Sequence, residues 1–273
     1  MASLLQISDT HFGTEVPEVV AALRRLNAEI EPDLLVISGD ITQRATRAQF
    51  KLARAFVDSL APQAVLALPG NHDVPLINLA LRMVDPFRRF RAAFGHVLEP
   101  VHDSESMLVI GVNTVRPRWH KDGAVSPLQI ARVADRLAAA RVEQLRIVVT
   151  HQPIEVIRPQ DRPNRLVRAE AAAKAWVAAG ADLVLGGHIH LPYFVSLRDR
   201  FPGLDRNAWL AQAGTALSSR IRGGIPNSVN VVRTGTVTTT GTARRSSMTI
   251  ERWDFDALHK AFRLGQERSV DAG

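Results

Sequence analysis

Short apolar runs alternate, over the first two thirds of the chain, with stretches in which apolar residues recur every three or four positions. A short apolar run is typical of a buried strand, and the three-to-four spacing is typical of a helix with one buried face. The strands predicted in this way are residues 4–8, 34–38, 65–68, 107–112, 147–150 and 183–186, and the predicted helices are residues 19–30, 48–60, 130–140 and 166–179. Strands that alternate with helices predict an α/β fold class.

The last third of the chain has a different pattern, rich in Thr, Val and Ser and interrupted by Gly and Pro. Residues 209–214, 229–233 and 248–255 are predicted strands and candidates to complete a second sheet, and residues 233–245 form either a hairpin or a mobile loop. No internal repeat and no long Ser/Gly linker divides the chain, so we expect a single domain over residues 1–264. Residues 265–273 are polar and are expected to form a flexible C-terminal tail.

Length and composition exclude several classes of protein. The chain has 273 residues, of which 46% are hydrophobic and 22% charged, close to the soluble globular average; this excludes a disordered chain, a coiled coil and a collagen-like repeat. No apolar run approaches the roughly 18 residues that span a bilayer. The N-terminus lacks the pattern of a signal peptide, so we expect a cytoplasmic protein.

Cysteine usage and net charge limit the kinds of metal site, nucleophile and partner that the chain can have. Cysteine is absent, which excludes a disulfide framework, a thiolate metal site and a cysteine nucleophile, so any metal site must use His, Asp, Asn or Glu. The net charge of +7 favours anionic partners. Arginine far outnumbers lysine, however, as in GC-rich genomes, so a nucleic acid or a membrane surface is an open but not a required partner.

Side chains that can bind metal follow five of the predicted strands. They are Asp9 and His11, then Asp40, then Asn71-His72-Asp73, then His151, and finally His188 and His190. In an open α/β sheet, ligands bind beyond the carboxyl ends of the strands, so we expect these side chains to surround one crevice. The glycines at 39, 70 and 187 allow a sharp turn there or a close approach of backbone to a ligand.

The spacing and type of these residues favour a site for two metal ions. Asp9 and His11 are two positions apart, as are His188 and His190, and would point to the same side of an extended chain. Oxygen and nitrogen donors together suit Mn, Fe, Zn or Co better than Ca or Mg. With His72 held apart, the candidate ligands are two Asp, one Asn and four His, namely Asp9, Asp40, Asn71, His11, His151, His188 and His190. Seven donors are too many for one four-coordinate ion and enough for two if a carboxylate bridges them. Each motif alone is a weak indication of a metal site, but a purely structural role does not explain the presence of all five motifs in this order.

The five blocks resemble the calcineurin-like metallophosphoesterase superfamily, whose pattern is D-x-H, GD, GNH[D/E], H and GHxH in that order. The resemblance covers about residues 4–193, and residues 214–222 and 227–230 also look similar to the family. It implies two packed mixed β-sheets flanked by helices, an α/β/β/α sandwich. It also implies a metal-dependent phosphoric ester hydrolase with two metal ions, Mn, Fe, Zn or Co.

The resemblance further implies a role for each matching residue. Asp9, His11 and His190 would bind the first metal, Asp40 would bridge the pair, and Asn71, His151 and His188 would bind the second. His72 would assist as proton donor or charge stabiliser at the scissile phosphate, oriented by Asp73. Ions about 3.5–4 Å apart would activate a bridging hydroxide for in-line attack on phosphorus.

The details of the motifs favour one subgroup of this superfamily. The block 39–42 lacks the Asp-Arg-Gly continuation of Ser/Thr protein phosphatases, and Asp73 stands where those enzymes usually carry Glu. Residues 7–12 and 70–73 look most similar to bacterial class III cyclic-nucleotide phosphodiesterases, although Gln152 stands where many relatives carry a second His. The predicted function is therefore hydrolysis of the phosphodiester bond of a small nucleotide, with a 3′,5′-cyclic one as a candidate.

Other functions and other residues remain open. A nuclease, a phosphomonoesterase or nucleotidase, or a lipid-pyrophosphate hydrolase would use the same ligands; the last needs an apolar cap, for which residues 83–94 are the candidate. A non-enzymatic scaffold is disfavoured because no ligand is missing. Asn113 and His120, in the loop after strand 107–112, are candidates for substrate contact, the alternative being a solvated loop.

Two further groups have a functional and a structural interpretation. Arg220 and Arg222 lie in a Gly-rich turn and could meet a phosphate, the alternative being a solvated face. Phe87, Phe90 and Phe94 recur at helical spacing among arginines. They form either a core stripe or a basic amphipathic helix that docks on a membrane or a partner.

Overall fold

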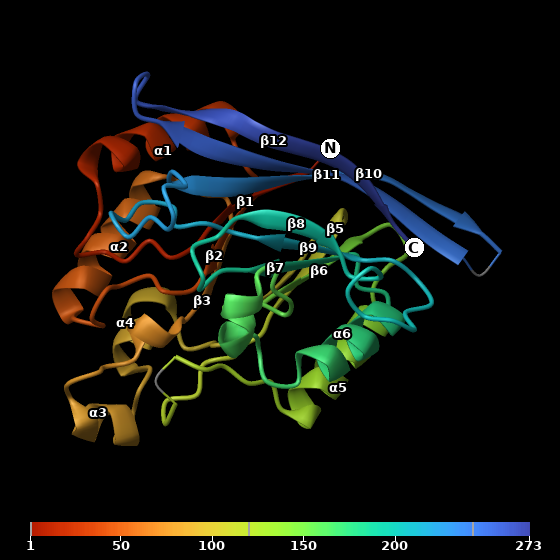
Figure 1. Cartoon of the computed structure of the whole chain (residues 1–273), viewed down its shortest axis with the longest axis horizontal. Coiled ribbons are helices and arrows are strands. Elements are labelled where there is room, and N and C mark those ends of the chain that lie inside the picture. Colours follow the sequence, from red (N-terminus) through yellow and green to blue (C-terminus); the bar gives the residue numbers. More distant parts are fainter. Residues whose placement is uncertain (1, 120, 242) are drawn as a thin grey trace.

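Two six-stranded β-sheets pack face to face in the computed structural model of the chain, with helices on both outer faces (Figure 1). The structure describes residues 2–119, 121–241 and 243–273. This α/β/β/α arrangement of two mixed sheets confirms the fold that the family resemblance implied.

The first sheet has the strand order β12-β11-β10-β1-β2-β3. Its strands are β1 (Ser3–Ile7), β2 (Leu34–Ser38), β3 (Val65–Leu68), β10 (Ser228–Thr240), β11 (Ala243–Asp256) and β12 (Ala261–Ala272). β1, β2 and β3 are parallel, and the helices α1 (Pro17–Ile30) and α2 (Arg47–Ser59) connect them. β10 pairs antiparallel with β1, and β11 and β12 continue the sheet as long antiparallel strands.

The second sheet has the order β4-β5-β6-β7-β9-β8. Its strands are β4 (Val101–Asp103), β5 (Met107–Gly111), β6 (Leu145–Val149), β7 (Leu183–Gly186), β8 (Tyr193–Ser196) and β9 (Trp209–Gln212). The four inner strands are parallel, with α5 (Pro127–Ala138) and α6 (Ala169–Ala178) on the outer face. The shorter helices are η1 (Asn71–Asp73), α3 (Leu79–Val84), α4 (Arg88–Phe94) and η2 (Pro159–Asn164).

Apolar side chains fill three layers of core. The central layer lies between the sheets and includes Leu4, Val36 and Leu66 of the first sheet and Val109, Ile147 and Leu185 of the second. In the outer layers, α1 and α2 pack on the first sheet, and α5 and α6 pack on the second through Val133 and Trp176. Each large apolar side chain fully buried in this way contributes roughly 1.5–3 kcal/mol. The parallel strands are buried on both faces, which is why they read as continuous apolar runs.

Capping side chains set where two of the helices begin. The hydroxyl of Thr46 accepts a hydrogen bond from the Gln49 amide at 3.2 Å at the start of α2. Ser126 and Gln129 cap α5 reciprocally, at 3.1 and 2.9 Å, and Pro127 occupies the first helical position, where no N–H is required. None of the helices in the described ranges is long and apolar enough to cross a membrane.

The last third of the chain departs from two expectations. Of its predicted strands, only β9 joins the second sheet, whereas β10 and β11 extend the first. Within residues 233–245, the described residues 233–240 and 243–245 belong to these two strands, which pair as a hairpin. Residues 265–273 were expected to be a flexible tail, but they lie largely in β12, where Ala272 pairs with Ser246 and Val270 is buried. Most of the side chains of β12 remain exposed, so its sequence is polar although its backbone is paired.

Candidate metal centre

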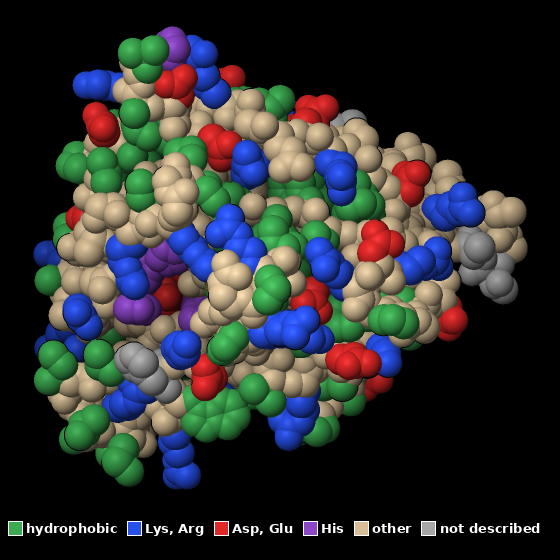
Figure 2. Space-filling view, viewed as in Figure 1, with side chains coloured by type: hydrophobic (Ala, Val, Ile, Leu, Met, Phe, Trp, Pro, Cys, Tyr) green, Lys and Arg blue, Asp and Glu red, His purple; other side chains and the backbone are tan. Residues whose placement is uncertain are grey.

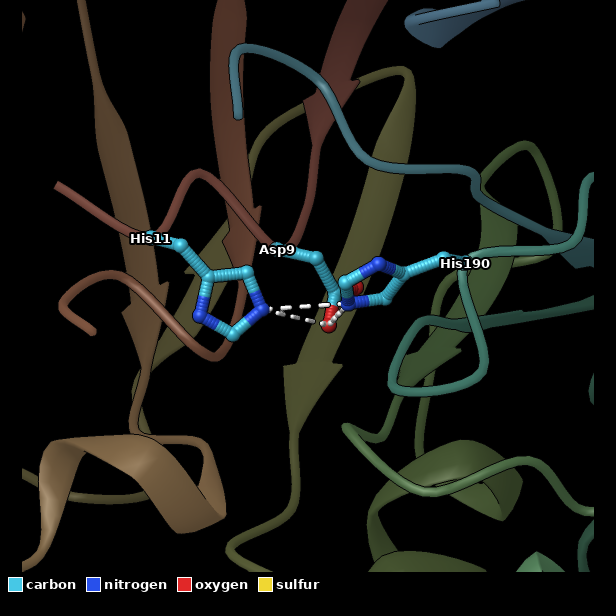
Figure 3. A group of neighbouring side chains, drawn as sticks. All are labelled: Asp9, His11 and His190. Carbon is cyan, nitrogen blue, oxygen red and sulfur yellow. Dashed lines mark hydrogen bonds and ion pairs between the residues drawn. The ribbon is translucent and has the colours of Figure 1, made fainter. Parts of the chain in front are cut away.

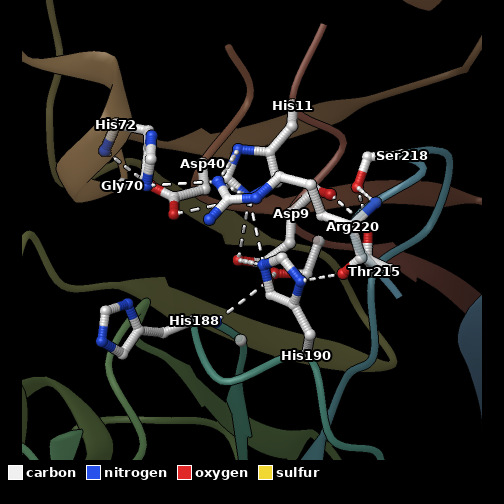
Figure 4. A network of polar contacts seen from close by, with 12 residues as sticks. Asp9, His11, Asp40, Gly70, His72, His188, His190, Thr215, Ser218 and Arg220 are labelled. Carbon is white, nitrogen blue, oxygen red and sulfur yellow. Dashed lines mark hydrogen bonds and ion pairs between the residues drawn. The ribbon is translucent and has the colours of Figure 1, made fainter. Parts of the chain in front are cut away.

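Five loops meet at the carboxyl ends of parallel strands, as the sequence predicted. They follow β1, β2, β3, β6 and β7, so three come from the first sheet and two from the second. The contact between His151 Nε2 and Asn71 Oδ1, at 3.1 Å, joins loops from the two sheets. Side chains from several of these loops face one another in Figure 4. The structure therefore brings together residues that lie up to 181 positions apart, from Asp9 to His190.

The first group of donors is Asp9, His11 and His190 (Figure 3). His11 Nε2 lies 3.0 Å from His190 Nε2, and His190 Nε2 lies 3.2 Å from Asp9 Oδ1. Asp9 and His11 are fully buried, and within the described ranges Asp9 Oδ1 has no hydrogen-bond partner. A buried carboxylate oxygen without a hydrogen bond is costly unless a cation compensates it.

The second group is Asp40, His151 and His188. Asp40 Oδ1 lies 3.3 Å from His151 Nε2, and the rings of His151 and His188 are 5.2 Å apart. His188 Nδ1 is buried and, in the part of the chain that is described, has no hydrogen-bond partner. Asp40 also reaches the first group, because its Oδ2 lies 3.8 Å from His11 Nε2. One carboxylate thus faces both groups, which is the arrangement that a bridging ligand requires.

The backbone of these residues is strained. Ten residues other than glycine have a positive φ in the described ranges, and five of them are Asp9, His11, Asp40, His188 and His190. Such conformations cost on the order of 1–3 kcal/mol each and cluster at functional sites. The expectation that each Asp-x-His or His-x-His pair lies on an extended chain is therefore wrong. The side chains converge because the chain turns at each residue.

Glycines allow the loops to approach one another closely. A Cβ on Gly70 would lie 2.0 Å from the amide nitrogen of Asp40, and one on Gly187 would lie 2.0 Å from Ser8 Oγ and 2.7 Å from Asp9 Oδ2. No side chain fits at these distances, so only glycine permits this packing. The backbone at both positions thus lies against neighbouring loops of the site, and the close approach to a ligand stays a prediction.

The four histidines of the two donor groups differ in the direction in which burial and nearby charge shift their pKa. Burial lowers the pKa of His11 and of His188 to about 3, so both rings are neutral and offer a free lone pair. For His151, burial lowers the pKa, but the charge and hydrogen bond of Asp40 outweigh it and raise the pKa to about 9. The pKa of His190 is likewise raised by Asp9 against the effect of burial. Nearby imidazoles keep the pKa of Asp9 and Asp40 low, against burial, so both are carboxylates.

This donor set fits metal ions. The donor atoms of two carboxylates, four imidazoles and the Asn71 amide lie close together. Among the described residues, each group includes one buried atom without a hydrogen-bond partner, Asp9 Oδ1 in the first and His188 Nδ1 in the second. Mixed nitrogen and oxygen ligands of this kind suit Mn, Fe, Zn or Co.

His72 faces the same site, but Asp73 does not orient it. The ring Nδ1 of His72 contacts the Gln43 carbonyl at 3.0 Å. The buried carboxylate of Asp73 instead accepts hydrogen bonds from the amides of Ile41, Thr42 and Gly70 and from the Thr42 hydroxyl, at 2.8–3.0 Å. Asp73 therefore ties the loop after β2 to the loop after β3, which corrects its expected role.

Arg220 belongs to the site, although the sequence favoured a solvated face for it. Its Nη1 lies 3.0 Å from Gln43 Oε1, 3.3 Å from His72 Nε2 and 3.4 Å from both ring nitrogens of His11 (Figure 4). Within the described part of the chain Arg220 forms no ion pair with a carboxylate. Arg222, in contrast, pairs with the buried Asp161 at 2.7 Å.

Sequence reasoning missed the residues that hold Arg220 in place. The hydroxyl of Thr215 donates to the Asp9 carbonyl at 2.6 Å and lies 2.7 Å from Ser218 Oγ, which accepts from the Arg220 amide at 3.2 Å. The turn after β9 is thereby fastened to the loop after β1. The resemblance of residues 214–222 to the family was the available signal.

The remaining candidates from the sequence are Asn113, His120 and the phenylalanines at 87, 90 and 94. The side chain of Asn113 accepts from the Val115 amide at 3.1 Å, and none of the hydrogen bonds described for Asn113 reaches the metal-site residues. His120 lies outside the described residues. Phe87 and Phe90 are buried, which confirms a core stripe rather than an exposed amphipathic helix.

Comparison with known proteins finds a matching family and two relatives. The model of the calcineurin-like phosphoesterase family matches residues 2–192. A probable cyclic nucleotide phosphodiesterase of Synechococcus sp. is 26% identical over 205 residues, 69% of this chain and 73% of the relative. A cAMP/cGMP dual specificity phosphodiesterase of Mycobacterium tuberculosis is 26% identical over 203 residues, 68% of this chain, and the match spans 61% of the length of that relative.

Solved structures share the fold at low sequence identity. A dimetal phosphatase of Danio rerio superposes with a TM-score of 0.65 at 10% identity, covering 98% of both chains. A purple acid phosphatase of yellow lupin gives a TM-score of 0.71 at 10% identity, covering 98% of this chain and 53% of that one.

Proposed function

Since the chain belongs to the calcineurin-like phosphoesterase family and is a phosphoric ester hydrolase, we propose that it hydrolyses phosphodiester bonds of small nucleotides. The substrates to test first are 3′,5′-cyclic nucleotides, because one curated relative is named a probable cyclic nucleotide phosphodiesterase and the other a cAMP/cGMP phosphodiesterase. The observation that carries the proposal is the position of Asp40, whose two oxygens face two separate histidine groups.

Two metal ions are the proposed cofactors. Asp9, His11 and His190 would hold one ion, Asn71, His151 and His188 the other, and Asp40 both. When bound, such a pair neutralises phosphate oxygens and activates water for attack on phosphorus. Their identity is expected among Mn, Fe, Zn and Co.

His72 is the proposed proton donor to the leaving oxygen. Its Nδ1 contacts the Gln43 carbonyl, so Nε2 is the nitrogen that faces the site. The carbonyl can accept a hydrogen bond from Nδ1–H, which orients the ring. Proton transfer from a positioned imidazole typically contributes about 10²–10⁴-fold in rate.

Arg220 is the proposed clamp for the substrate phosphate. Its guanidinium lies beside His11 and His72 and, among the described residues, has no carboxylate partner. A guanidinium presents several donors in a planar fork that matches a phosphate group. It would hold the phosphate with one non-bridging oxygen toward Arg220 and the leaving oxygen toward His72.

A paired hydrolysis assay tests this proposal. Mn²⁺-loaded protein is given bis-(p-nitrophenyl) phosphate or p-nitrophenyl phosphate, with His72→Ala as the matched variant. Faster turnover of the diester, reduced about 10²–10⁴-fold in the variant, supports a phosphodiesterase. Preference for the monoester overturns it in favour of a phosphomonoesterase. A panel of cyclic nucleotides and single-stranded DNA then separates a nucleotide phosphodiesterase from a nuclease, whose binding would weaken steeply with salt.

A further inference from the structure

Apolar side chains gather on the surface around α3. Ile77 is 88% exposed, Leu79 66%, Met83 79% and Val84 86%, and no residue of α3 is buried. Trp119 is 44% exposed on the neighbouring loop, which is tied to α3 because Arg82 Nη2 donates to the Trp119 carbonyl at 3.1 Å. Single exposed apolar residues are ordinary, but a contiguous group marks a contact surface. We call these five apolar residues the α3 patch.

Cations surround the α3 patch. A groove of about 810 Å³ between α2 and α4 adjoins α3 through Asn78 and Leu81, and its apolar floor includes Phe50. The charged residues that line it are Arg47, Lys51, Arg54, Arg88 and Arg89, with Asp58 as the one acid. Asp58 is already paired with Arg54. Arg118 lies with Met83 and Trp119 in a second hollow of about 640 Å³. A partner for this surface must therefore be apolar and anionic at once.

The α3 patch is on the same face as the metal centre. Leu76, which directly precedes the patch, lines a small cavity together with Asn71 and His72. Figure 2 shows hydrophobic side chains gathered over α3 at the lower left, on the face that also presents the histidine-lined hollow. A flat partner that covers the α3 patch would thus lie in front of the metal site.

We propose that the α3 patch and its surrounding cations dock the protein on an anionic phospholipid bilayer. The apolar side chains of α3 would enter the boundary between headgroups and acyl chains, with Trp119 at headgroup level. Arg47, Lys51 and Arg88, for which the described residues supply no carboxylate partner, would meet lipid phosphates. A second copy of the chain fits less well, because a two-fold interface joins the same surface of both copies and would bring two sets of these cations together. The proposal concerns where the protein binds and is independent of which ester it hydrolyses.

Vesicle flotation of the full, Mn²⁺-loaded chain tests the proposal. The probes are phosphatidylcholine vesicles with and without about 30 mol% phosphatidylglycerol. The variant is Ile77→Ser/Leu79→Ser/Met83→Ser/Val84→Ser, and the matched control is Leu128→Ser/Leu258→Ser, at sites 75% and 86% exposed on other parts of the surface. We expect binding to anionic vesicles that weakens about tenfold or more in the variant and in neutral vesicles, and that is unchanged in the control.

Three results would overturn the proposal. They are no flotation with anionic vesicles, equal flotation of the variant and the wild type, and a wild-type dimer that the variant abolishes without any vesicle binding. Trp119 fluorescence should shift to the blue on vesicle binding, and Trp119→Phe should remove that shift. Hydrolysis of the soluble diester is measured in parallel and should be equal in wild type and variant. That readout shows that the variant is folded and separates failure of docking from failure of the proposed activity.

Discussion

The backbone carbonyl of Arg220 accepts a hydrogen bond from Nδ1 of His190 at 2.6 Å. This bond orients the imidazole so that its Nε2 lies 3.2 Å from Asp9 Oδ1. The guanidinium of the same Arg220 lies 3.3 Å from His72 Nε2. The main chain of Arg220 therefore supports a proposed metal ligand, while its side chain is available to the substrate.

Arg220→Ala should weaken substrate binding without loss of metal. The substitution keeps the carbonyl that holds His190 but removes the phosphate donor, so KM for a diester should rise about 10–100-fold, at about 1.4 kcal/mol per tenfold. Metal content by elemental analysis should equal that of the wild type. Arg206→Ala is the control: it removes an ion pair of the buried Asp182, immediately before β7, and should lower stability but not raise KM. An unchanged KM in Arg220→Ala would remove the guanidinium from the proposed mechanism.

Asp73→Asn should affect stability more than proton transfer. The carboxylate accepts four hydrogen bonds, and an amide has one accepting oxygen, so about two buried donors lose their partners. At roughly 1–3 kcal/mol for each unsatisfied group, the free energy of unfolding should fall by about 3 kcal/mol, measured by urea denaturation. The shape of the kcat–pH profile should stay that of the wild type, because none of the hydrogen bonds described for Asp73 reaches the His72 ring. A profile displaced by Asp73→Asn would restore a direct role for Asp73 in orienting His72.

Metal binding should release protons and strengthen with pH. In the metal-free protein the pKa of His151 is raised to about 9 and that of His190 is also raised, so at pH 7 the proton competes with the metal for the same nitrogen. Apparent affinity should rise by about tenfold per pH unit for each displaced proton, up to about pH 9 for the proton of His151. His11 and His188, with pKa values of about 3, should contribute nothing to this dependence near pH 7. Calorimetric titration in buffers of different ionisation enthalpy measures the protons released, and a heat independent of the buffer would contradict the expectation.

The sequence predicted the site's location for a simple physical reason. Carboxyl ends of parallel strands share an edge, so polar residues that follow apolar runs must meet there. Asp9, Asp40 and His151 each follow such a run, so their convergence could be predicted from the sequence alone. The backbone conformation of the site residues could not be predicted from the sequence, because the left-handed backbone at Asp9 and His11 depends on contacts from other loops. One such contact is the hydrogen bond from the Asp9 amide to the Gly39 carbonyl at 3.0 Å.

Contacts between distant segments of the chain explain why the sequence did not predict the position of Arg220 or the strand β12. Arg220 reaches the site because the Ala216 amide donates to the Ser8 carbonyl at 2.9 Å, across more than 200 residues, and no periodicity encodes that contact. β12 was missed because its side chains are mostly exposed, so backbone pairing rather than burial determines the strand. Asn113 was a candidate for substrate contact because it follows a strand, the alternative being a solvated loop, and its side chain completes a turn within its own loop.

The number of metal ions per chain, measured by elemental analysis after reconstitution and desalting, decides whether the site holds a bridged pair of ions. The position of Asp40 between His11 and His151 predicts two ions in the wild type and one or fewer in Asp40→Asn. A wild-type protein that retains one ion or none, or an Asp40→Asn variant that retains two, would contradict a bridged two-metal site.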